Sequence, residues 1–271
     1  MLISGETRLV GLLGYPLSHS LSPRMQNAAF TAAGLDWAYV PLPVEPGRLE
    51  EAVAGLAALG FIGANVTIPH NTGVLAFCDE LDAVAERGGS VNTLLVLDGR
   101  VLGSSTDGAA VTGALAAEGA RVLLLGAGGA AQAVATALAD AGCASLRVAA
   151  RSAERAHALA LRLRGLFPDR PMEADDGWPP EAGDADLVVN ATPVRDDPLV
   201  ELGTVRQVVD LAYRLDGGET ALVAAARAAG CERVVDGLDV LVGQGAASFE
   251  RWTGLQAPRE VMGAAVRSLS P

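Results

Sequence analysis

The sequence predicts an α/β protein built of two α/β domains, the second a Rossmann-type doubly wound parallel sheet. Short apolar runs of strand length alternate with helix-length segments along most of the chain. A glycine-rich turn at 126–131 joins a strand to a helix. The final segment, 237–271, has helical spacing, and we expect its helices to return to the first domain.

The expected elements of the first domain begin with a buried strand at 9–14, an apolar run that ends in Gly14. Ser22-Pro23 then predicts a helix to about residue 33, with Ser22 as N-cap and the proline in the first turn. The remaining elements are a strand at 37–43, a helix at 46–59 ended by Gly60, a strand at 61–66, a further helix entered at Pro69, and a hairpin of 91–97 with 100–103.

The second domain repeats strand and helix at the spacing of parallel βαβ units. Its expected elements are a helix at 106–118, a strand at 121–125, a helix opened by the turn at 126–131, a strand at 145–150, a helix at 153–166, strands at 186–190 and 205–211, and a helix at 219–229. The proline-rich, acidic stretch 168–183 predicts a surface loop with room for one edge strand. We therefore expect one domain over 1–105 plus 237–271 and the other over 106–236.

The charge balance argues against nucleic-acid binding. The net charge is −12, from 32 acidic and 20 basic residues, and no basic stripe is present. All 20 basic residues are arginine. An acidic chain that binds an anion must concentrate its few cations and backbone amides at that ligand. We expect a small-molecule substrate as partner, and a monomer or homodimer.

The cysteines and the hydropathy indicate a cytoplasmic protein. Cys78, Cys143 and Cys231 are few and far apart, which predicts free thiols and neither a disulfide framework nor a metal site. No signal peptide is recognisable, and no apolar run reaches the ~18 residues that a membrane-spanning helix needs.

The turn at 126–131 predicts a dinucleotide site. Gly126 allows a tight turn, Gly128 lets backbone amides approach a pyrophosphate, and the following helix directs its amino end at the anion. In NAD-binding folds, an Asp or Glu at the end of the next strand binds the ribose 2′-hydroxyl. This chain has Arg151, Ser152 and Arg155 at that position. Arginine grips a 2′-phosphate, so we expect NADP. The alternative for the loop is that its glycines serve only the packing of helix on sheet. The alternative for Arg151 and Arg155 is that they are solvated residues at the start of a helix.

Four polar stretches fall at strand ends or starts of the first domain. They are 18–23, 63–71, 90–93 and 104–108. Caps and turns explain any one of them. Together, their hydroxyl and amide groups suit a small polyhydroxylated ligand.

These motifs resemble those of the shikimate dehydrogenase family. In order they are GYPLSHSLSP, GANVTIPH, GSVNT, STDG, LGAGGAAQAV, VVNATP, DLAY and DGLDVLVGQGAASFERWTG, which run from Gly14 to Gly254. The resemblance implies a two-domain α/β enzyme, an oxidoreductase of aromatic amino acid biosynthesis. Its members reversibly reduce 3-dehydroshikimate to shikimate with NADPH.

The resemblance also implies roles for individual residues. Substrate would be bound by Ser20, Ser22, Asn65, Thr67, Asn92, Asp107, Tyr213 and Gln244. The pyrophosphate would lie on Gly126, Ala127, Gly128, Gly129 and Ala130, the 2′-phosphate on Arg151 and Ser152, and the nicotinamide end near Ala191, Thr192, Leu211 and Gly237.

The chain departs from the family pattern at the catalytic position. The family has a lysine, paired with an aspartate, where this chain has Asn71, and Asp107 matches the aspartate. An asparagine amide donates a hydrogen bond but does not titrate near neutral pH. Smaller departures are Gln26 for histidine, Ser105 for asparagine, and Asp239-Val240 for glycine-methionine.

Three interpretations follow from Asn71. The chain is a shikimate dehydrogenase impaired by the substitution, or a quinate/shikimate dehydrogenase that uses Asp107 or His70 instead, or a sensor that binds NADP or a shikimate-like ligand without catalysis. The loss of a general acid typically costs about 10²–10⁴ in rate, so the three differ in turnover more than in binding.

Overall fold

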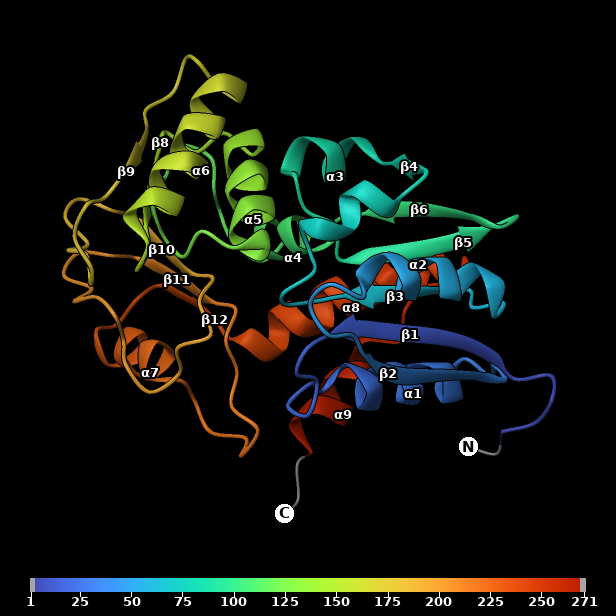
Figure 1. The fold of residues 1–271 in the computed structure, drawn as a ribbon. Coiled ribbons are helices and arrows are strands. Elements are labelled where there is room, and N and C mark those ends of the chain that lie inside the picture. Colours follow the sequence, from blue (N-terminus) through green and yellow to red (C-terminus); the bar gives the residue numbers. More distant parts are fainter. Residues whose placement is uncertain (1–2, 269–271) are drawn as a thin grey trace. The chain divides into compact units, whose positions relative to one another are not determined.

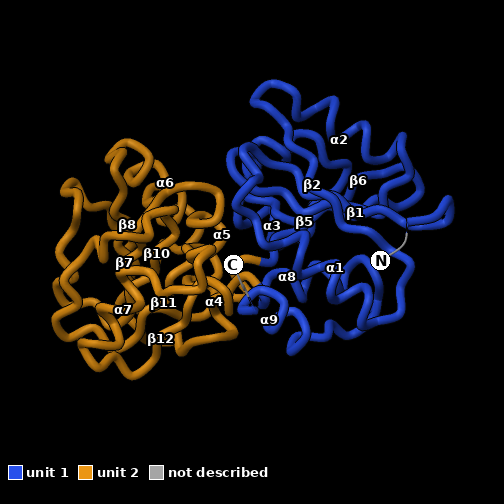
Figure 2. The backbone as a smooth tube through the Cα atoms, turned by 90° about the horizontal axis from the view of Figure 1, so that it is seen from below, with its two compact units in different colours: residues 1–106, 242–271 blue, residues 107–241 orange. Residues whose placement is uncertain are grey.

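The computed structural model describes residues 3–268. The chain divides into two compact units, residues 1–106 with 242–271 and residues 107–241 (Figure 2). Both boundaries fall slightly later in the chain than the sequence suggests. Each unit has its own sheet of six strands.

The sheet of the first unit is mixed. Its strands are β1 (Arg8–Gly14), β2 (Trp37–Pro43), β3 (Gly63–Val66), β4 (Glu80–Leu81), β5 (Thr93–Leu97) and β6 (Arg100–Ser104), in the spatial order β2-β1-β3-β5-β6-β4. The first strand pairs in parallel with β2 and β3, whereas β5 runs antiparallel to both of its neighbours. As a result, β5 begins at the sheet edge where β1, β3 and β6 end.

Helices cover both faces of this sheet (Figure 1). They are α1 (Ser22–Ala32), α2 (Leu49–Ala58), the short α3 (Ala83–Gly88), α8 (Gly237–Thr253) and α9 (Arg259–Arg267), with a 3-10 turn, η1, at Gly73–Phe77. One face buries Leu49, Val53 and Leu56 of α2 in a common core. On the other face α1 contacts α9, and Phe30 stacks on Phe249 of α8. The predicted return of the C-terminal helices to the first unit is confirmed.

The sheet of the second unit is fully parallel. Its strands are β7 (Arg121–Leu125), β8 (Ser145–Ala149), β9 (Met172–Ala174), β10 (Leu187–Asn190), β11 (Gln207–Asp210) and β12 (Arg233–Val235), in the order β12-β11-β10-β7-β8-β9. Counted within the unit, the order is that of the Rossmann fold, with its switch point between β7 and β10. The predicted fold class is confirmed.

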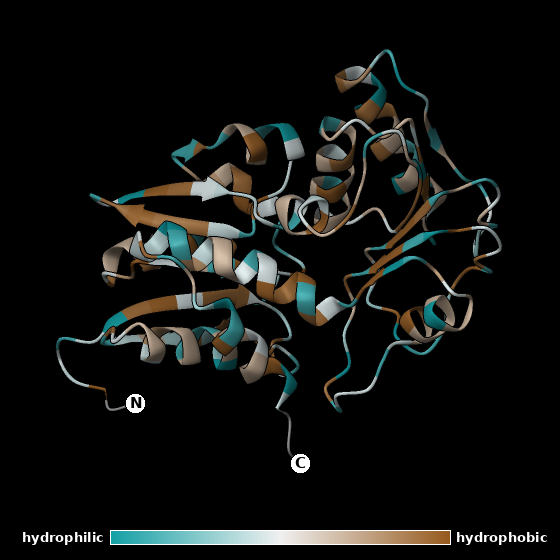
Figure 3. Ribbon diagram, turned by 180° about the vertical axis from the view of Figure 1, so that it is seen from behind, coloured by the Kyte–Doolittle hydropathy of each residue, from teal (hydrophilic) through white to brown (hydrophobic). Residues whose placement is uncertain are grey.

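Helices also cover both faces of the second sheet. The helices α5 (Gly129–Asp140) and α6 (Ala153–Leu166) lie on one face and α7 (Ala221–Ala228) on the other, while α4 (Asp107–Thr112) contacts α5. Along β7, Val122 and Leu124 join the core on the α5–α6 side, and Leu123 and Leu125 join the core on the α7 side. Figure 3 shows hydrophobic residues along the central strands, as burial on two faces requires.

Three local predictions are wrong. Leu21, not Ser22, is the N-cap of α1, without a side-chain cap bond, and Ser22 is the first helical residue. Pro69 does not open an α-helix, because it follows a cis peptide bond and leads through a turn into η1. The helix expected over 106–118 is α4, which ends at Thr112 next to Gly113. The short elements α3, β4 and β12 were not predicted. Within residues 3–268, no helix combines the length and the apolar character needed to span a bilayer.

The close approach of β3 to β5 depends on a glycine. A Cβ atom at Gly63 would clash with the backbone oxygen of Leu94 on β5 and lie 2.7 Å from Nε1 of Trp252. Since backbone cannot yield, we expect Gly63→Ala to lower the free energy of unfolding by about 2 kcal/mol or more. The midpoint of urea unfolding measures it.

Gly55→Ala in α2 is the matched control. A Cβ there meets nothing within 4 Å, and alanine restricts the unfolded chain, so stability should rise by up to about 1 kcal/mol. Equal effects of the two substitutions would contradict this packing account.

Candidate functional site

The polar stretches of the first unit converge on one edge of its sheet. Because β5 is antiparallel to β3, Thr93 at its start lies opposite Asn65 near the end of β3. Thr93 also pairs with Ser104 at the end of β6. Most polar side chains at this edge are buried: Asn65, Asn71, Ser90, Asn92, Thr93, Ser104, Ser105, Thr106 and Ser248. A buried edge this rich in polar groups needs a dense hydrogen-bond network.

Asn65 is the centre of that network. Its Oδ1 accepts a hydrogen bond from the Tyr39 hydroxyl at 2.8 Å. Its Nδ2 donates to the backbone oxygen of Asn92 and to Ser248 Oγ, both at 2.9 Å. The side chain is 5% exposed. One amide therefore ties β2, the start of β5 and α8 to the end of β3.

Asn92 fixes the chain at the end of β6. Its Oδ1 accepts from the backbone N–H of Thr106 at 2.9 Å, and its Nδ2 donates to Thr106 Oγ1 at 2.9 Å. Thr106 immediately precedes Asp107, the first residue of α4. The expected substrate ligand Asn92 thus also sets where the expected catalytic aspartate begins its helix.

The loop after β3 is anchored at both ends. The N–H of Thr67 donates to Leu13 O at 2.8 Å, and Asn71 O accepts from Val91 N–H at 2.8 Å. Asn71 Nδ2 donates back to Val66 O at 3.0 Å, and the side chain is 9% exposed. Asn71 therefore closes its own loop as well as occupying the expected catalytic position.

His70 has a structural explanation. Its ring Nε2 lies 2.7 Å from Val44 O, and the side chain is buried. A carbonyl only accepts, so Nε2 carries the proton of this bond. The ring joins the loop after β3 to the residue after β2, which does not support the alternative of His70 as the catalyst.

The remaining expected substrate residues of the first unit lie around the start of α1 and on α8. Ser20 Oγ accepts from Ser22 N–H at 3.3 Å. Gln244 lies one turn before Ser248, whose hydroxyl donates to Gln244 O at 3.0 Å. Asp107 and Tyr213 belong to the second unit. Tyr39, Thr93 and Ser248 were not predicted as individual site residues, although helical spacing from Gln244 could have indicated Ser248.

The glycine-rich turn of the second unit has the geometry of an anion-binding loop. Gly126 has φ +111°, and a Cβ there would lie 3.0 Å from Ala191 O, so only glycine fits between the ends of β7 and β10. Gly128 is the N-cap of α5 without a side-chain cap bond, and nothing lies within 4 Å of its Cβ position. Internal packing does not explain glycine at 128, whereas a pyrophosphate on the helix amino end does.

The end of β8 presents two arginines. Arg151 and Arg155 are exposed, and neither guanidinium joins an ion pair among residues 3–268. Ser152 is the N-cap of α6, where its Oγ accepts from Arg155 N–H at 3.3 Å. These groups stand at the ribose end expected for a Rossmann fold, so they fit a 2′-phosphate.

The ends of β10 and β11 carry a buried acid. Asp210 Oδ1 accepts from Asn190 Nδ2 at 2.8 Å and from Ala212 N–H at 2.9 Å. Burial raises the pKa of Asp210 to about 6, despite the hydrogen bonds that oppose the shift, and the charge of Asp236 adds to it. Of the expected nicotinamide residues, Thr192 donates to Asn190 Oδ1, and a Cβ at Gly237 would clash with Ala212 O.

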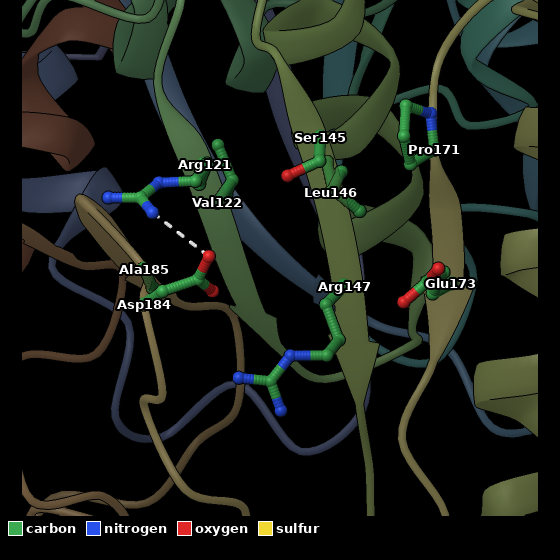
Figure 4. Close-up of a pocket in the computed structure, with 9 residues that line it drawn as sticks. All are labelled: Arg121, Val122, Ser145, Leu146, Arg147, Pro171, Glu173, Asp184 and Ala185. Carbon is green, nitrogen blue, oxygen red and sulfur yellow. Dashed lines mark hydrogen bonds and ion pairs between the residues drawn. The ribbon is translucent and has the colours of Figure 1, made fainter.

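A pocket of about 260 Å³ lies at the opposite edge of the second sheet (Figure 4). It is lined by Arg121 and Ser145, the first residues of β7 and β8. Arg121 binds Asp184 and Asp186, and its hydrogen bonds lower the pKa of Asp186 to about 2. Arg147 binds Asp175 and two backbone carbonyls. Ligands of open parallel sheets bind at the carboxyl ends of the strands, so we assign this pocket no ligand.

Comparison with known proteins identifies the family. Three family models match: the shikimate dehydrogenase substrate binding domain over residues 12–94, shikimate/quinate 5-dehydrogenase over 110–212, and the shikimate 5′-dehydrogenase C-terminal domain over 237–267. The shikimate dehydrogenase (NADP⁺) of Moorella thermoacetica is 45% identical, over 98% of this chain and 94% of that protein. The chain belongs to the shikimate dehydrogenase family.

Solved structures of shikimate dehydrogenases agree. One in complex with NADP⁺ has a TM-score of 0.87 and 34% identity, covering 98% of this chain and 96% of its own. The enzyme of Thermus thermophilus in complex with NADP(H) and shikimate has a TM-score of 0.82 and 35% identity, covering 96% and 99%. The curated relatives are named as NADP⁺-dependent shikimate dehydrogenases, and a similar solved structure holds NADP⁺, which confirms the predicted enzyme class and cofactor. The relatives support the dehydrogenase and not the sensor or the enzyme that works without lysine through Asp107 or His70.

Asp210 should make the stability of this shikimate dehydrogenase homologue depend on pH. Its pKa is 3.8 in a model peptide and about 6 here, so the folded state holds the proton more tightly than the unfolded chain. The contribution of Asp210 to the free energy of unfolding is therefore full below pH 3.8, and it is lost as the pH rises through about 6. We expect a decrease in unfolding free energy on the order of 3 kcal/mol across that range.

Urea unfolding at a series of pH values measures this decrease, and Asp210→Asn should remove it. Asp186→Asn is the contrasting variant, because the pKa of Asp186 is lowered and its contribution is lost as the pH falls. Parallel profiles for the unsubstituted protein and Asp210→Asn would refute the assignment.

Proposed function

We propose that the protein catalyses the reversible, NADPH-dependent reduction of 3-dehydroshikimate to shikimate. The observation that carries this proposal is the pairing, in one chain, of a Rossmann unit whose Gly128 no internal contact explains with a unit whose polar residues gather at one sheet edge. The related structure with NADP(H) and shikimate bound supports both ligands. We place the reaction in the cytoplasm, in a monomer or homodimer.

Most of the proposed substrate-binding residues belong to the first unit, and Tyr213 belongs to the second. Ser20 and Ser22, with Tyr213, hold the carboxylate, and Thr67 and Gln244 contact the ring. Asn65 and Asn92 act at the ring hydroxyls and also hold the sheet edge, since their side chains bond to protein groups. A substrate hydroxyl that contacted Asn65 would join a hydrogen-bond network whose geometry is already fixed. Binding would therefore lose little free energy to the ordering of these side chains.

The second unit binds the cofactor. Gly126, Ala127, Gly128, Gly129 and Ala130 present the amino end of α5 to the pyrophosphate. Arg151, Ser152 and Arg155 bind the 2′-phosphate, and Ala191, Thr192, Leu211 and Gly237 line the nicotinamide end. When bound, NADPH supplies the hydride.

Proton transfer to the substrate oxygen is the step that this chain performs poorly. Reduction of the ketone requires a donor to its oxygen, and the family's lysine supplies a titrating cation at position 71. Asn71 offers an N–H that stabilises an oxyanion but does not release a proton, and part of its amide is held by Val66 O. Asp107 remains as the ionisable partner. The proposed activity is therefore that of a shikimate dehydrogenase with a slowed proton transfer.

Asn71→Lys should raise kcat for shikimate-dependent NADP⁺ reduction at least ten-fold, at the lower end of the usual effect of a general acid, about 10²–10⁴. The KM for shikimate should change less than three-fold, because the hydrogen-bonding groups around the ring remain. Steady-state kinetics measures both.

Asn71→Met is the matched control, since methionine has the reach of lysine without its charge. It should not raise kcat. A rate in the unsubstituted protein that Asn71→Lys leaves unchanged would show that the lysine is dispensable here.

The cofactor preference should depend on Arg151. Arg151→Ala should raise the KM for NADP⁺ about ten-fold or more and leave the KM for NAD⁺ unchanged, because NAD⁺ lacks the 2′-phosphate. Arg233→Ala, an exposed arginine at the start of β12, controls for net charge. Equal losses with the two dinucleotides would remove Arg151 from the 2′-phosphate site.

A further inference from the structure

The carboxylate of Asp210 connects three chain segments of the second unit. It is fully buried, at 0% exposure. Oδ1 accepts from Asn190 Nδ2 and from Ala212 N–H, while Oδ2 accepts from Thr220 Oγ1 at 2.5 Å. Thr220 is in turn the N-cap of α7, where its hydroxyl accepts from Val223 N–H. One side chain thus joins the end of β10, the end of β11 and the start of α7.

Asn190 passes the connection on to the turn after β10. Its Oδ1 accepts from Thr192 N–H at 2.9 Å and from Thr192 Oγ1 at 2.7 Å. Thr192 Oγ1 then accepts from Val194 N–H at 3.2 Å. An unbroken series of hydrogen bonds therefore runs from the buried carboxylate to the turn that begins with Ala191 and Thr192.

The two carboxylate oxygens have different tasks. Oδ1 bonds to Asn190 and Ala212, beside the turns that contain Thr192 and Leu211. Within residues 3–268, Oδ2 bonds only to Thr220, at the cap of a helix. The division means that the two sides can be tested separately.

A buried carboxylate stabilises a core poorly, because it loses its hydration. No arginine forms an ion pair with Asp210 among the described residues, and burial disfavours its charged form. An apolar side chain of similar size would pack with less desolvation penalty. The polar side chain is explained by the two hydrogen bonds that Oδ1 accepts at neighbouring turns, and its second oxygen by the bond from Thr220.

We propose that Asp210 is a positioning residue for the cofactor: through Oδ1 it orients the turns at Ala191–Thr192 and Leu211–Ala212 for the nicotinamide end of NADP. The inference rests on the proposed function, because that function places the nicotinamide at these turns. Asp210 touches neither reactant and acts through Asn190 and the backbone.

The test compares two substitutions on opposite sides of the same carboxylate. Asn190→Ala removes the bridge from Oδ1 to Thr192, and we expect the Kd for NADP⁺, measured by fluorescence titration of the full chain, to rise about ten-fold. The KM for shikimate at saturating NADP⁺ should stay within two-fold. Thr220→Val removes the bond to Oδ2 and the helix cap, so Tm should fall while the Kd for NADP⁺ stays within two-fold.

Substitutions of the acid itself complete the test. Asp210→Asn keeps an oxygen for Asn190 and Ala212 and offers an N–H to Thr220, so NADP⁺ affinity should be retained. Asp210→Ala should weaken NADP⁺ binding at least as much as Asn190→Ala. Val209→Ala, a core truncation on the same strand, is the control for destabilisation and should leave the Kd unchanged.

The outcomes separate the inference from the function on which it rests. If Thr220→Val or Val209→Ala weakens NADP⁺ binding as much as Asn190→Ala, the network is only structural and the inference is overturned. Unchanged binding in Asn190→Ala overturns it too, and this arm does not depend on whether Asp210→Ala folds. If the unsubstituted protein binds no NADP⁺, the proposed function itself fails.

Discussion

The buried amide of Asn65 is the interaction on which the polar edge of the first unit depends. From one position near the end of β3, it forms hydrogen bonds with the Tyr39 hydroxyl, the backbone oxygen of Asn92 and the Ser248 hydroxyl. These groups come from segments far apart in the chain, and the one side chain of Asn65 bonds to all three. The antiparallel course of β5 makes the arrangement possible, because it starts at the edge where β1, β3 and β6 end.

In the second unit, the buried side chain of Asp210 connects neighbouring segments in the way that Asn65 does in the first. Asp210 joins β10, β11 and α7 as Asn65 joins β2, β5 and α8. In both cases a single buried polar side chain at a strand end fixes the backbone just outside the sheet. In both units, rigid strands thereby determine the geometry of turns that would otherwise have few contacts of their own.

The fold class and most strands were predictable from the sequence because short apolar runs of strand length end in glycine or polar turns and alternate with helix-length segments. The nucleotide loop was predictable because Gly126 and Gly128 stand between a strand and a helix. The errors lie where local signals compete: Ser22-Pro23 suggested a cap one residue late, and the sequence around Pro69 gave no sign of a cis peptide bond. Short elements such as β12 are stabilised by their neighbours rather than by their own composition.

The site was only partly predictable. Motifs indicated which residues gather at the strand ends, but not that Asn65 and Asn92 are bonded to protein groups or that His70 is held by Val44 O. Those facts depend on side chains that meet across the sheet, which spacing along the chain does not reveal. Asp210 was missed for the same reason, since an acid at a strand end looks ordinary until its partners are known.

The side chain at position 71 is buried, and the chain contains no lysine. A lysine placed there would carry the sole ε-amine of the molecule, distinct from every guanidinium. Its nitrogen resonance would stand alone in an NMR spectrum selective for side-chain amines, and its titration could be followed without assignment of any other signal. Because arginine supplies all 20 of the lysine and arginine positions, the proton affinity of a lysine in this dehydrogenase site could be measured without interference from other lysines.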